Sequence, residues 1–369
     1  MNLSEHRGNL KFLDGLRGIL CLIVVVDHCV NTFMPSLRYT RDPGFHGFIK
    51  HIIALSPLNI IYSGLPSVYL FFIMSGFVIS YKFNKIKDSD IIVKSSLKRY
   101  LRFSIPIVAS YFIMYVSSIL FWGEILPFKD IMWEAVYVSE FCHEPVKNYA
   151  LWTISFEIFG SFLIFSLLGI FGYSKNRILF YFIVMIFLFN TYYSFFVFGL
   201  ILSDLWVNKR IKHIKSRFIL FLCMLLSVFF ITYPFPRDGV HLGGIYNIIT
   251  FSNDWSYNYS VYTKIGCFLL FFGILISNDL KKIFSSVIPL FFGKISFPIY
   301  LIHVSVLTSI LCIYGKSSSF LWFLFMLFLS IIITIIISIP FEIFIDRFGI
   351  KISNKFSDFL VGNKIKFFK

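Results

Sequence analysis

Residues 13–29 read LDGLRGILCLIVVVDHC, an apolar run that predicts a membrane helix. The run nevertheless carries four ionisable side chains, namely Asp14, Arg17, Asp27 and His28. A charged side chain at the centre of a bilayer costs about 2.5–3.5 kcal/mol on insertion scales. A partner within the protein, or a function, must therefore offset that cost.

The composition extends this pattern to the whole chain. Of the 369 residues, 57% are hydrophobic and 14% are charged, and the mean hydropathy is +0.80, whereas soluble domains are about 25% charged. Apolar stretches of roughly membrane-spanning length recur throughout. The sequence predicts an all-α, polytopic transmembrane helix bundle with about ten spans. These are residues 13–34, 58–81, 103–122, 149–171, 178–191, 193–206, 218–234, 261–279, 287–312 and 320–345.

The basic residues favour one orientation of these spans. With the N-terminus inside, the cytoplasmic segments hold 24 Lys and Arg and the outer loops hold 7. The positive-inside rule then predicts both termini in the cytoplasm, with a transmembrane domain over residues 1–346 and a short basic cytoplasmic tail over 347–369. The same asymmetry explains the net charge of +15 through contact with membrane lipid, so nucleic acid is not an expected partner.

Helical geometry groups the ionisable residues of the first span. Arg17 and His28 are eleven residues apart, about 20° past three full turns and roughly 16 Å along the axis. Asp14 lies about 40° from His28 on the same face, whereas Asp27 points about 100° away and is not expected to pair with His28. Two interpretations remain open. Asp14 and Arg17 can form an ion pair beside a structural His28, or this face can carry a function.

The two longest outer loops differ in character. Residues 123–148 lean acidic, whereas residues 235–260 combine Arg237, Asp238 and His241 with aromatic side chains. The second loop fits a lid or a sugar-contact surface, and a solvated loop fits equally well. Cys142 and His143 are adjacent and lack the ligand spacing of a zinc site, so no metal is expected.

Six segments in order resemble the membrane proteins of acyltransferase family 3. They are FLDGLRGILCLIVVVDH (12–28), LFFIMSGF (70–77), RYLR (99–102), LWTISFE (151–157), FVFG (196–199) and SFPIYLIH (296–303). Two positions depart from the family's pattern. Asp27 stands where an apolar or aromatic residue is usual, and Ile158-Phe159-Gly160 follows Glu157 where a second Glu or Gln and Phe-Tyr are common.

This resemblance implies an enzyme, an O-acetyltransferase that moves acetyl from acetyl-CoA to a sugar hydroxyl of an exported glycan such as O-antigen or capsule. The expected location is the bacterial inner membrane, and the expected partners are acetyl-CoA, a glycan or lipid-linked glycan, and membrane lipid. His28 is then the general base or the acyl carrier, and Glu157 orients it or pairs with Arg17. Arg99 and Arg102 are expected to dock the CoA phosphates, and Arg17 guides the donor or holds the bundle.

Other polar residues in the spans are candidates for the acceptor side. They are Asp14, Asp27, Ser75, Trp152, Tyr300 and His303. Ser75 also fits a small helix-packing residue beside Gly76, and His303 also fits a structural histidine bonded to backbone. A transporter or flippase for lipid-linked saccharides, using the same intramembrane charges without chemistry, is the alternative function.

Overall fold

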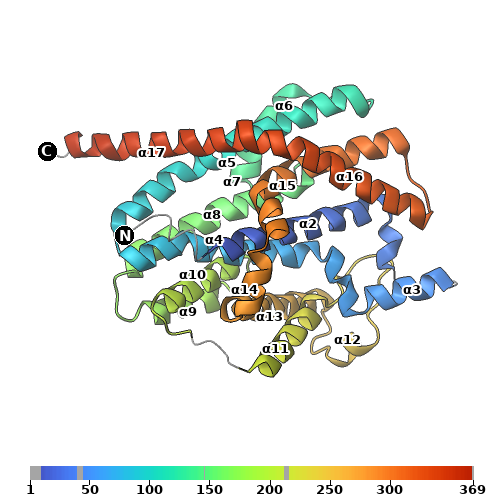
Figure 1. The fold of residues 1–369 in the computed structure, drawn as a ribbon, viewed down its shortest axis with the longest axis horizontal. Coiled ribbons are helices and arrows are strands. Elements are labelled where there is room, and N and C mark those ends of the chain that lie inside the picture. Colours follow the sequence, from blue (N-terminus) through green and yellow to red (C-terminus); the bar gives the residue numbers. More distant parts are fainter. Residues whose placement is uncertain (1–9, 40–44, 145, 212–215, 368–369) are drawn as a thin grey trace. The chain divides into compact units, whose positions relative to one another are not determined.

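The computed structural model of the protein describes residues 10–39, 45–144, 146–211 and 216–367. Every regular element in these ranges is an α-helix or a short 3₁₀ or π turn, and none is a strand (Figure 1). The predicted all-α fold class is confirmed.

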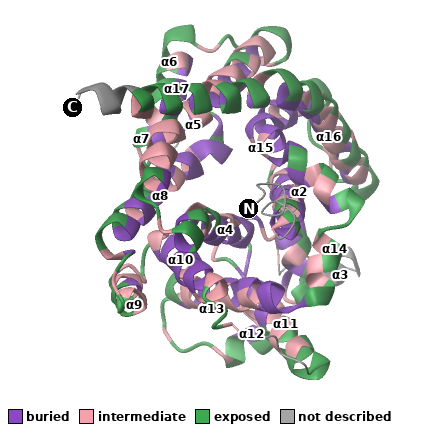
Figure 2. Cartoon of the chain, turned by 60° about the vertical axis from the view of Figure 1, so that its left-hand side comes forward, coloured by how far each residue is buried: buried purple, intermediate pink, exposed green. Residues whose placement is uncertain are grey.

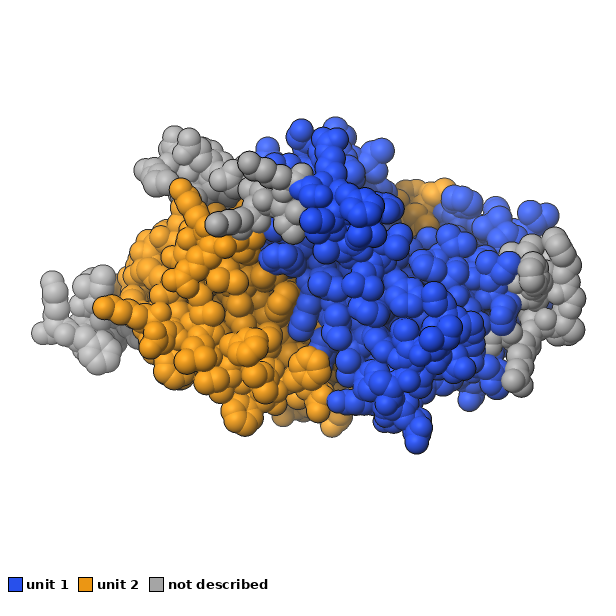
Figure 3. All heavy atoms as spheres, turned by 90° about the horizontal axis from the view of Figure 1, so that it is seen from below, with its two compact units in different colours: residues 1–70, 212–293, 316–329 blue, residues 71–211, 294–315, 330–369 orange. Residues whose placement is uncertain are grey.

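The chain divides into two compact units (Figure 3). Unit 1 contains residues 1–70, 212–293 and 316–329, and unit 2 contains residues 71–211, 294–315 and 330–369. Three of the five boundaries fall inside helices, namely α4 (Gly64–Ile86), α15 (Val287–Tyr314) and α16 (Phe320–Phe341). The predicted division at residue 346 separates transmembrane from cytoplasmic residues, whereas the compact units are defined by packing. That division therefore stays a prediction.

Unit 1 holds the predicted first helix and the polar loop 235–260. Serine and aspartate caps set where three of its helices begin: Asp254 accepts from the backbone N–H of Tyr257, and Ser216 and Ser277 act in the same way. Helices α11 and α13 pack along each other. The elements are α2 (Lys11–Phe33), η1 (Pro35–Arg38), α3 (Phe45–Ala54), η2 (Pro57–Tyr62), α11 (Arg217–Ile231), α12 (Ile245–Ile248), α13 (Trp255–Ile276), α14 (Asn278–Phe284) and the beginnings of α4, α15 and α16.

Unit 2 holds the remaining motif segments. Its helix α5 begins at Ser89, where Asp88 caps it, so Arg99 and Arg102 lie inside a long helix. The residues predicted to form a tail are helical and pack along α5. The elements are α5 (Ser89–Phe121), α6 (Phe128–Trp133), η3 (Glu134–Val138), α7 (Ser139–Phe141), η4 (Tyr149–Leu151), α8 (Trp152–Phe171), α9 (Arg177–Phe187), α10 (Tyr193–Val207), η5 (Glu342–Asp346), α17 (Arg347–Phe367) and the later parts of α4, α15 and α16.

Within the described residues, six helices are long and apolar enough to cross a membrane. They are Gly64–Ile86, Ser89–Phe121, Tyr149–Phe171, Trp255–Ile276, Val287–Tyr314 and Phe320–Gly362. Helices α9, α10 and α11 are apolar but shorter, and α2 carries several charges. The chain is a multi-pass membrane protein, while the count of ten spans and the cytoplasmic termini stay predictions.

The helices differ in the share of their residues that is buried within the protein. In the most apolar part of each helix, 72% of residues are buried in α15 and 67% in α4, but only 22% in the continuous helix Phe320–Gly362 (Figure 2). An exposed apolar helix surface is stable when lipid covers it. The Phe320–Gly362 helix therefore presents the kind of surface that suits lipid contact.

Two motif segments meet at a close helix crossing in unit 2. A Cβ atom on Gly76 of α4 would collide with the carbonyl oxygen of Phe196 on α10, and a Cβ on Gly199 would collide with that of Ile73. Small residues let helix backbones approach this closely in membranes. The glycines of the LFFIMSGF and FVFG segments thus serve the same contact.

Replacing Gly76 by Ala is expected to lower stability by about 1–3 kcal/mol, because the new methyl group must push two backbones apart. Gly169→Ala in α8 is the matched control, since its Cβ would meet no atom within 4 Å. The control is expected to be neutral or slightly stabilising. Thermal midpoints in detergent test this, and equal midpoints for the two variants would contradict the crossing.

Candidate functional site

Helix α2 of unit 1 carries both Arg17 and His28, as the helical periodicity predicted. Arg17 Nη1 lies 3.5 Å from Asp14 Oδ1, so the ion pair expected at this spacing is present. The two side chains are 38% and 56% exposed, and exposed pairs contribute little to stability. The guidance of a donor by Arg17 stays a prediction.

His28 lies closer to Asp27 than the helical wheel suggests. His28 Nε2 and Asp27 Oδ2 are 4.0 Å apart, which is longer than a hydrogen bond. The two residues are therefore not a hydrogen-bonded dyad, yet a carboxylate lies beside the imidazole. Both side chains are largely buried.

Asp27 is fixed by donors that the sequence pattern did not reveal. Arg38 Nη2 donates to Asp27 Oδ1 at 2.6 Å, and the backbone N–H of Gly64 donates to the same oxygen at 3.3 Å. Asn31 donates to Oδ2 at 3.1 Å. Glycine is needed at position 64, because a Cβ there would lie 2.6 Å from Asp27 Cγ.

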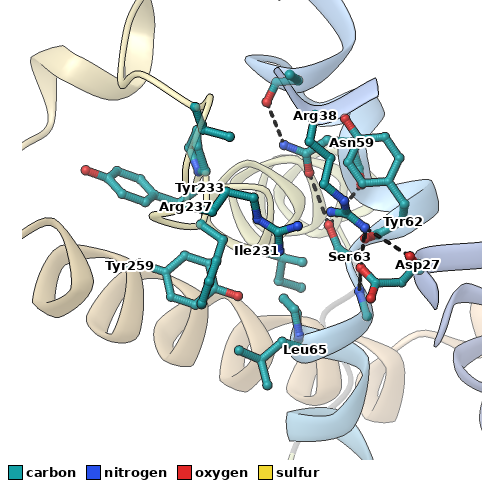
Figure 4. Close-up of a pocket in the computed structure, with 16 residues that line it drawn as sticks. Asp27, Arg38, Asn59, Tyr62, Ser63, Leu65, Ile231, Tyr233, Arg237 and Tyr259 are labelled. Carbon is teal, nitrogen blue, oxygen red and sulfur yellow. Dashed lines mark hydrogen bonds and ion pairs between the residues drawn. The ribbon is translucent and has the colours of Figure 1, made fainter. Parts of the chain in front are cut away.

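A cavity of about 130 Å³ opens beside this carboxylate (Figure 4). Its wall includes Asp27 and Arg38 together with Tyr62, Arg237 and Tyr259. Asn59 braces the wall, since its amide donates to the carbonyls of Ala54 and Thr232 at 3.1 and 2.8 Å. Of the predicted acceptor-side residues, Asp27 lines this cavity. Arg38 was not a predicted site residue, whereas Arg237 belongs to the loop 235–260, for which the sequence left a lid or sugar-contact surface and a solvated loop both open.

Unit 2 brings Ser75, Arg99 and Glu157 together. Arg99 Nη2 and the hydroxyl of Ser75 both donate to Glu157 Oε1, and the Arg99 guanidinium lies 4.6 Å from the Phe103 ring centroid. Glu157 and His28 belong to different units, so the predicted action of Glu157 on His28 stays a prediction. Ser75 lies next to the Gly76 crossing and also donates to Glu157, so its packing role and its acceptor-side role both stay predictions.

The second arginine of the RYLR segment also has a carboxylate partner. Arg102 donates from Nη1 and Nη2 to the two oxygens of Asp346 at 2.6 and 3.3 Å, a bidentate contact. Lys94 approaches Asp358 at 3.3 Å on the same pair of helices. Each arginine is thus neutralised, and CoA phosphates would have to compete with Glu157 and Asp346 for them.

The remaining acceptor-side candidates lie in unit 2. The Tyr300 hydroxyl donates to the carbonyl of Ala150 at 2.6 Å and lies 2.7 Å from the Thr153 hydroxyl. Nδ1 of the buried His303 lies 3.0 Å from the Ile299 carbonyl, the backbone bond expected of a structural histidine. The Trp152 ring packs against Phe156 and Tyr192. Their acceptor roles stay predictions, and no cluster of three metal-binding side chains occurs within the described ranges.

One glutamate of the acidic loop 123–148 is not solvated. Glu140 is fully buried, and its Oε2 accepts a hydrogen bond from Ser104 at 3.0 Å. Within the described chain, its Oε1 has no hydrogen-bond partner. Burial raises the pKa of Glu140 to about 8, with the Ser104 bond opposing that shift. Burial therefore favours the protonated carboxyl group in the folded protein at neutral pH.

The raised pKa of Glu140 makes stability depend on pH. Between about 4.5 and 8 the folded state keeps a proton that the unfolded chain releases, so stability falls as pH rises through this window. Glu140→Gln, which mimics the neutral acid, should remove this loss, worth roughly 3–5 kcal/mol. Its thermal midpoint should exceed that of the unchanged protein more at pH 8.5 than at pH 5. The exposed Glu144→Gln is the control, and an equal effect of both variants would refute the assignment.

A protein family and a known relative match this chain in sequence. A family described as the acyltransferase domain matches residues 10–339. An O-acetyltransferase, PaAT-1 of Phomopsis amygdali, is 30% identical over 134 residues, which cover 33% of this chain and 26% of that relative. The chain thus aligns with about a quarter of the relative's length. No protein of solved structure matches.

The family match spans both units and includes the segments that carry His28, Arg99 and Glu157. The helical membrane architecture agrees with this match. The protein belongs to acyltransferase family 3, the family of membrane acyltransferases that its motifs resemble.

Proposed function

We propose that the protein is an O-acetyltransferase that moves acetyl from acetyl-CoA to a sugar hydroxyl of an exported glycan, such as O-antigen or capsule. It acts in a bacterial plasma membrane with both termini in the cytoplasm. The observation that carries the proposal is His28, held in α2 beside the Asp27 carboxylate within a chain of this family. The relative named as an O-acetyltransferase supports acetyl as the transferred group.

His28 supplies the proton chemistry of this reaction. The acceptor oxygen forms a bond to the thioester carbonyl carbon, the imidazole takes the hydroxyl proton, and the bond to the CoA sulfur breaks. The thiolate then receives a proton. The same ring can instead accept the acetyl group first and pass it on, the second route that the residues allow.

The donor is held by charge on the cytoplasmic side. CoA is a polyanion, and arginine forks match phosphate oxygens. Arg99 and Arg102 serve this docking, with Lys94 and Lys98 on the same helix. Arg99 is already paired with the Glu157 carboxylate. CoA binding therefore replaces that carboxylate with a CoA phosphate as the anionic partner of Arg99.

This exchange predicts how CoA affinity responds to the Arg99–Glu157 pair. Glu157→Gln frees Arg99 and should tighten CoA binding several-fold. Arg99→Gln should weaken binding about tenfold, and the double variant should bind as weakly as Arg99→Gln alone, because without Arg99 the Glu157→Gln change frees no arginine. Calorimetric titration of the protein in lipid nanodiscs measures both effects.

A purely structural pair would behave differently, because the double variant would bind CoA like the unchanged protein. That result would remove Arg99 from the donor site. Arg177→Gln is the control, since it breaks the comparable buried Arg177–Asp204 pair of unit 2. It should lower the thermal midpoint and leave CoA affinity unchanged.

Loss of the His28 imidazole should separate chemistry from binding. With acetyl-CoA labelled in its acetyl group, His28→Ala is expected to transfer label to envelope glycan about 10²–10⁴-fold more slowly while binding CoA normally. The exposed His51→Ala is the matched control. Normal transfer by His28→Ala would refute the assigned role, and absence of CoA binding by the unchanged protein would favour the saccharide transporter instead.

A further inference from the structure

The cavity of unit 1 has an unbalanced charge. Arg38 is paired with Asp27 at 2.6 Å. Arg237 donates from Nη1 to the neutral side-chain oxygen of Asn31 at 3.0 Å, and within the described residues no carboxylate lies at ion-pair distance from it. Two guanidinium groups and one carboxylate therefore line the cavity, which leaves one positive charge.

The two guanidinium groups point toward each other across the cavity (Figure 4). Burial, followed by the nearby charge of Arg38, lowers the pKa of Arg237. Like charges held together away from bulk water repel strongly unless an anion lies between them. Asp27 offsets part of this repulsion, and a bound anion would offset the remainder.

Buried hydrogen-bonding groups in the wall also lack partners. Arg38 Nε and the Tyr62 hydroxyl have no hydrogen-bond partner in the described part of the chain, although these residues are only 9% and 6% exposed. Buried polar groups normally find partners, and each one left without a partner destabilises the fold. Both residues line the cavity, so a ligand there can complete their bonding.

Four aromatic side chains contribute to the wall beside aliphatic ones such as Leu65 and Ile231. Tyr62 stacks under the Arg38 guanidinium at 4.5 Å, and Phe235 lies under that of Arg237 at 5.2 Å. Tyr233 and Tyr259 complete this side of the cavity. Aromatic walls with a few placed polar groups are typical of small-ligand sites, and about 130 Å³ exceeds the space of a single water many-fold.

We propose that this cavity binds the carboxylate-bearing ring of an acidic sugar, with Arg237 and Arg38 holding the carboxylate and the aromatic side chains covering the ring. The proposal rests on the proposed function, because it makes the acidic sugar part of the acceptor glycan. A single negative charge matches the one uncompensated guanidinium. A phosphate ester, which carries close to two charges, would exceed it.

Direct binding tests the cavity without any acyl donor. The probes are methyl β-glucuronide, methyl β-glucoside and glucose 6-phosphate, titrated by saturation-transfer NMR into the full chain in nanodiscs. The glucuronide is expected to bind at least tenfold more tightly than the other two. Arg237→Gln should weaken glucuronide binding about tenfold, and Arg237→Lys should weaken it less, because the charge stays but the fork is lost.

Arg217→Gln is the matched control, since its guanidinium lies on unit 1 and is 90% exposed. It should leave glucuronide binding unchanged, and thermal midpoints establish that each variant is folded. Equal binding of glucuronide and glucoside, tighter binding of glucose 6-phosphate, or unchanged binding in Arg237→Gln would each overturn the proposal. Because the titration contains no acetyl-CoA, it tests the cavity alone. Glucuronide binding together with no transfer in the separate labelled acetyl-CoA assay would refute the enzyme proposal and leave the cavity assignment standing.

Discussion

An ionised side chain placed among apolar helices loses its hydration, and contact with a group of opposite charge recovers part of the lost free energy. This constraint organises the polar interior of both units. Four buried or half-buried carboxylates each hold a guanidinium, and several of these contacts join segments far apart in sequence. The pairs are Asp27–Arg38, Arg99–Glu157, Arg102–Asp346 and Arg177–Asp204. Breaking such a pair typically costs about 3–5 kcal/mol, because the remaining charge stays buried alone.

These ion pairs also determine which arginine side chains are available to bind a ligand. Arg99 and Arg102 are occupied, so a polyanionic donor must displace a carboxylate before it can use them. Arg237 differs, because the side chain that accepts its hydrogen bond within the described residues is the neutral amide of Asn31. His28 lies next to Asp27, which belongs to the wall of the cavity that contains Arg237. The proposed acid–base residue, His28, is thus the sequence neighbour of Asp27, a residue that lines the proposed acceptor cavity.

Much of the fold could be predicted from sequence, because helix period and span length follow from local geometry. The common helix of Arg17 and His28 and the Asp14–Arg17 pair follow from residue spacing alone. Tertiary partners could not be predicted in this way. Arg38 reaches Asp27 through a 3₁₀ turn, and Glu157 meets Arg99 across two helices, so neither distance is encoded in a local pattern. The burial of Glu140 was likewise hidden, since an acidic loop normally indicates solvent exposure.

The most direct test of the central claim is to map where the acyl group of bound acetyl-CoA lies. A CoA thioester carrying a photoreactive acyl group would be bound to the full chain in nanodiscs, irradiated, and the labelled peptides identified by mass spectrometry. Delivery of acetyl to His28 predicts labelling of α2 near this residue, suppressed by excess acetyl-CoA. Saturable labelling that is confined to other segments, or no labelling that acetyl-CoA competes away, would contradict transfer at His28.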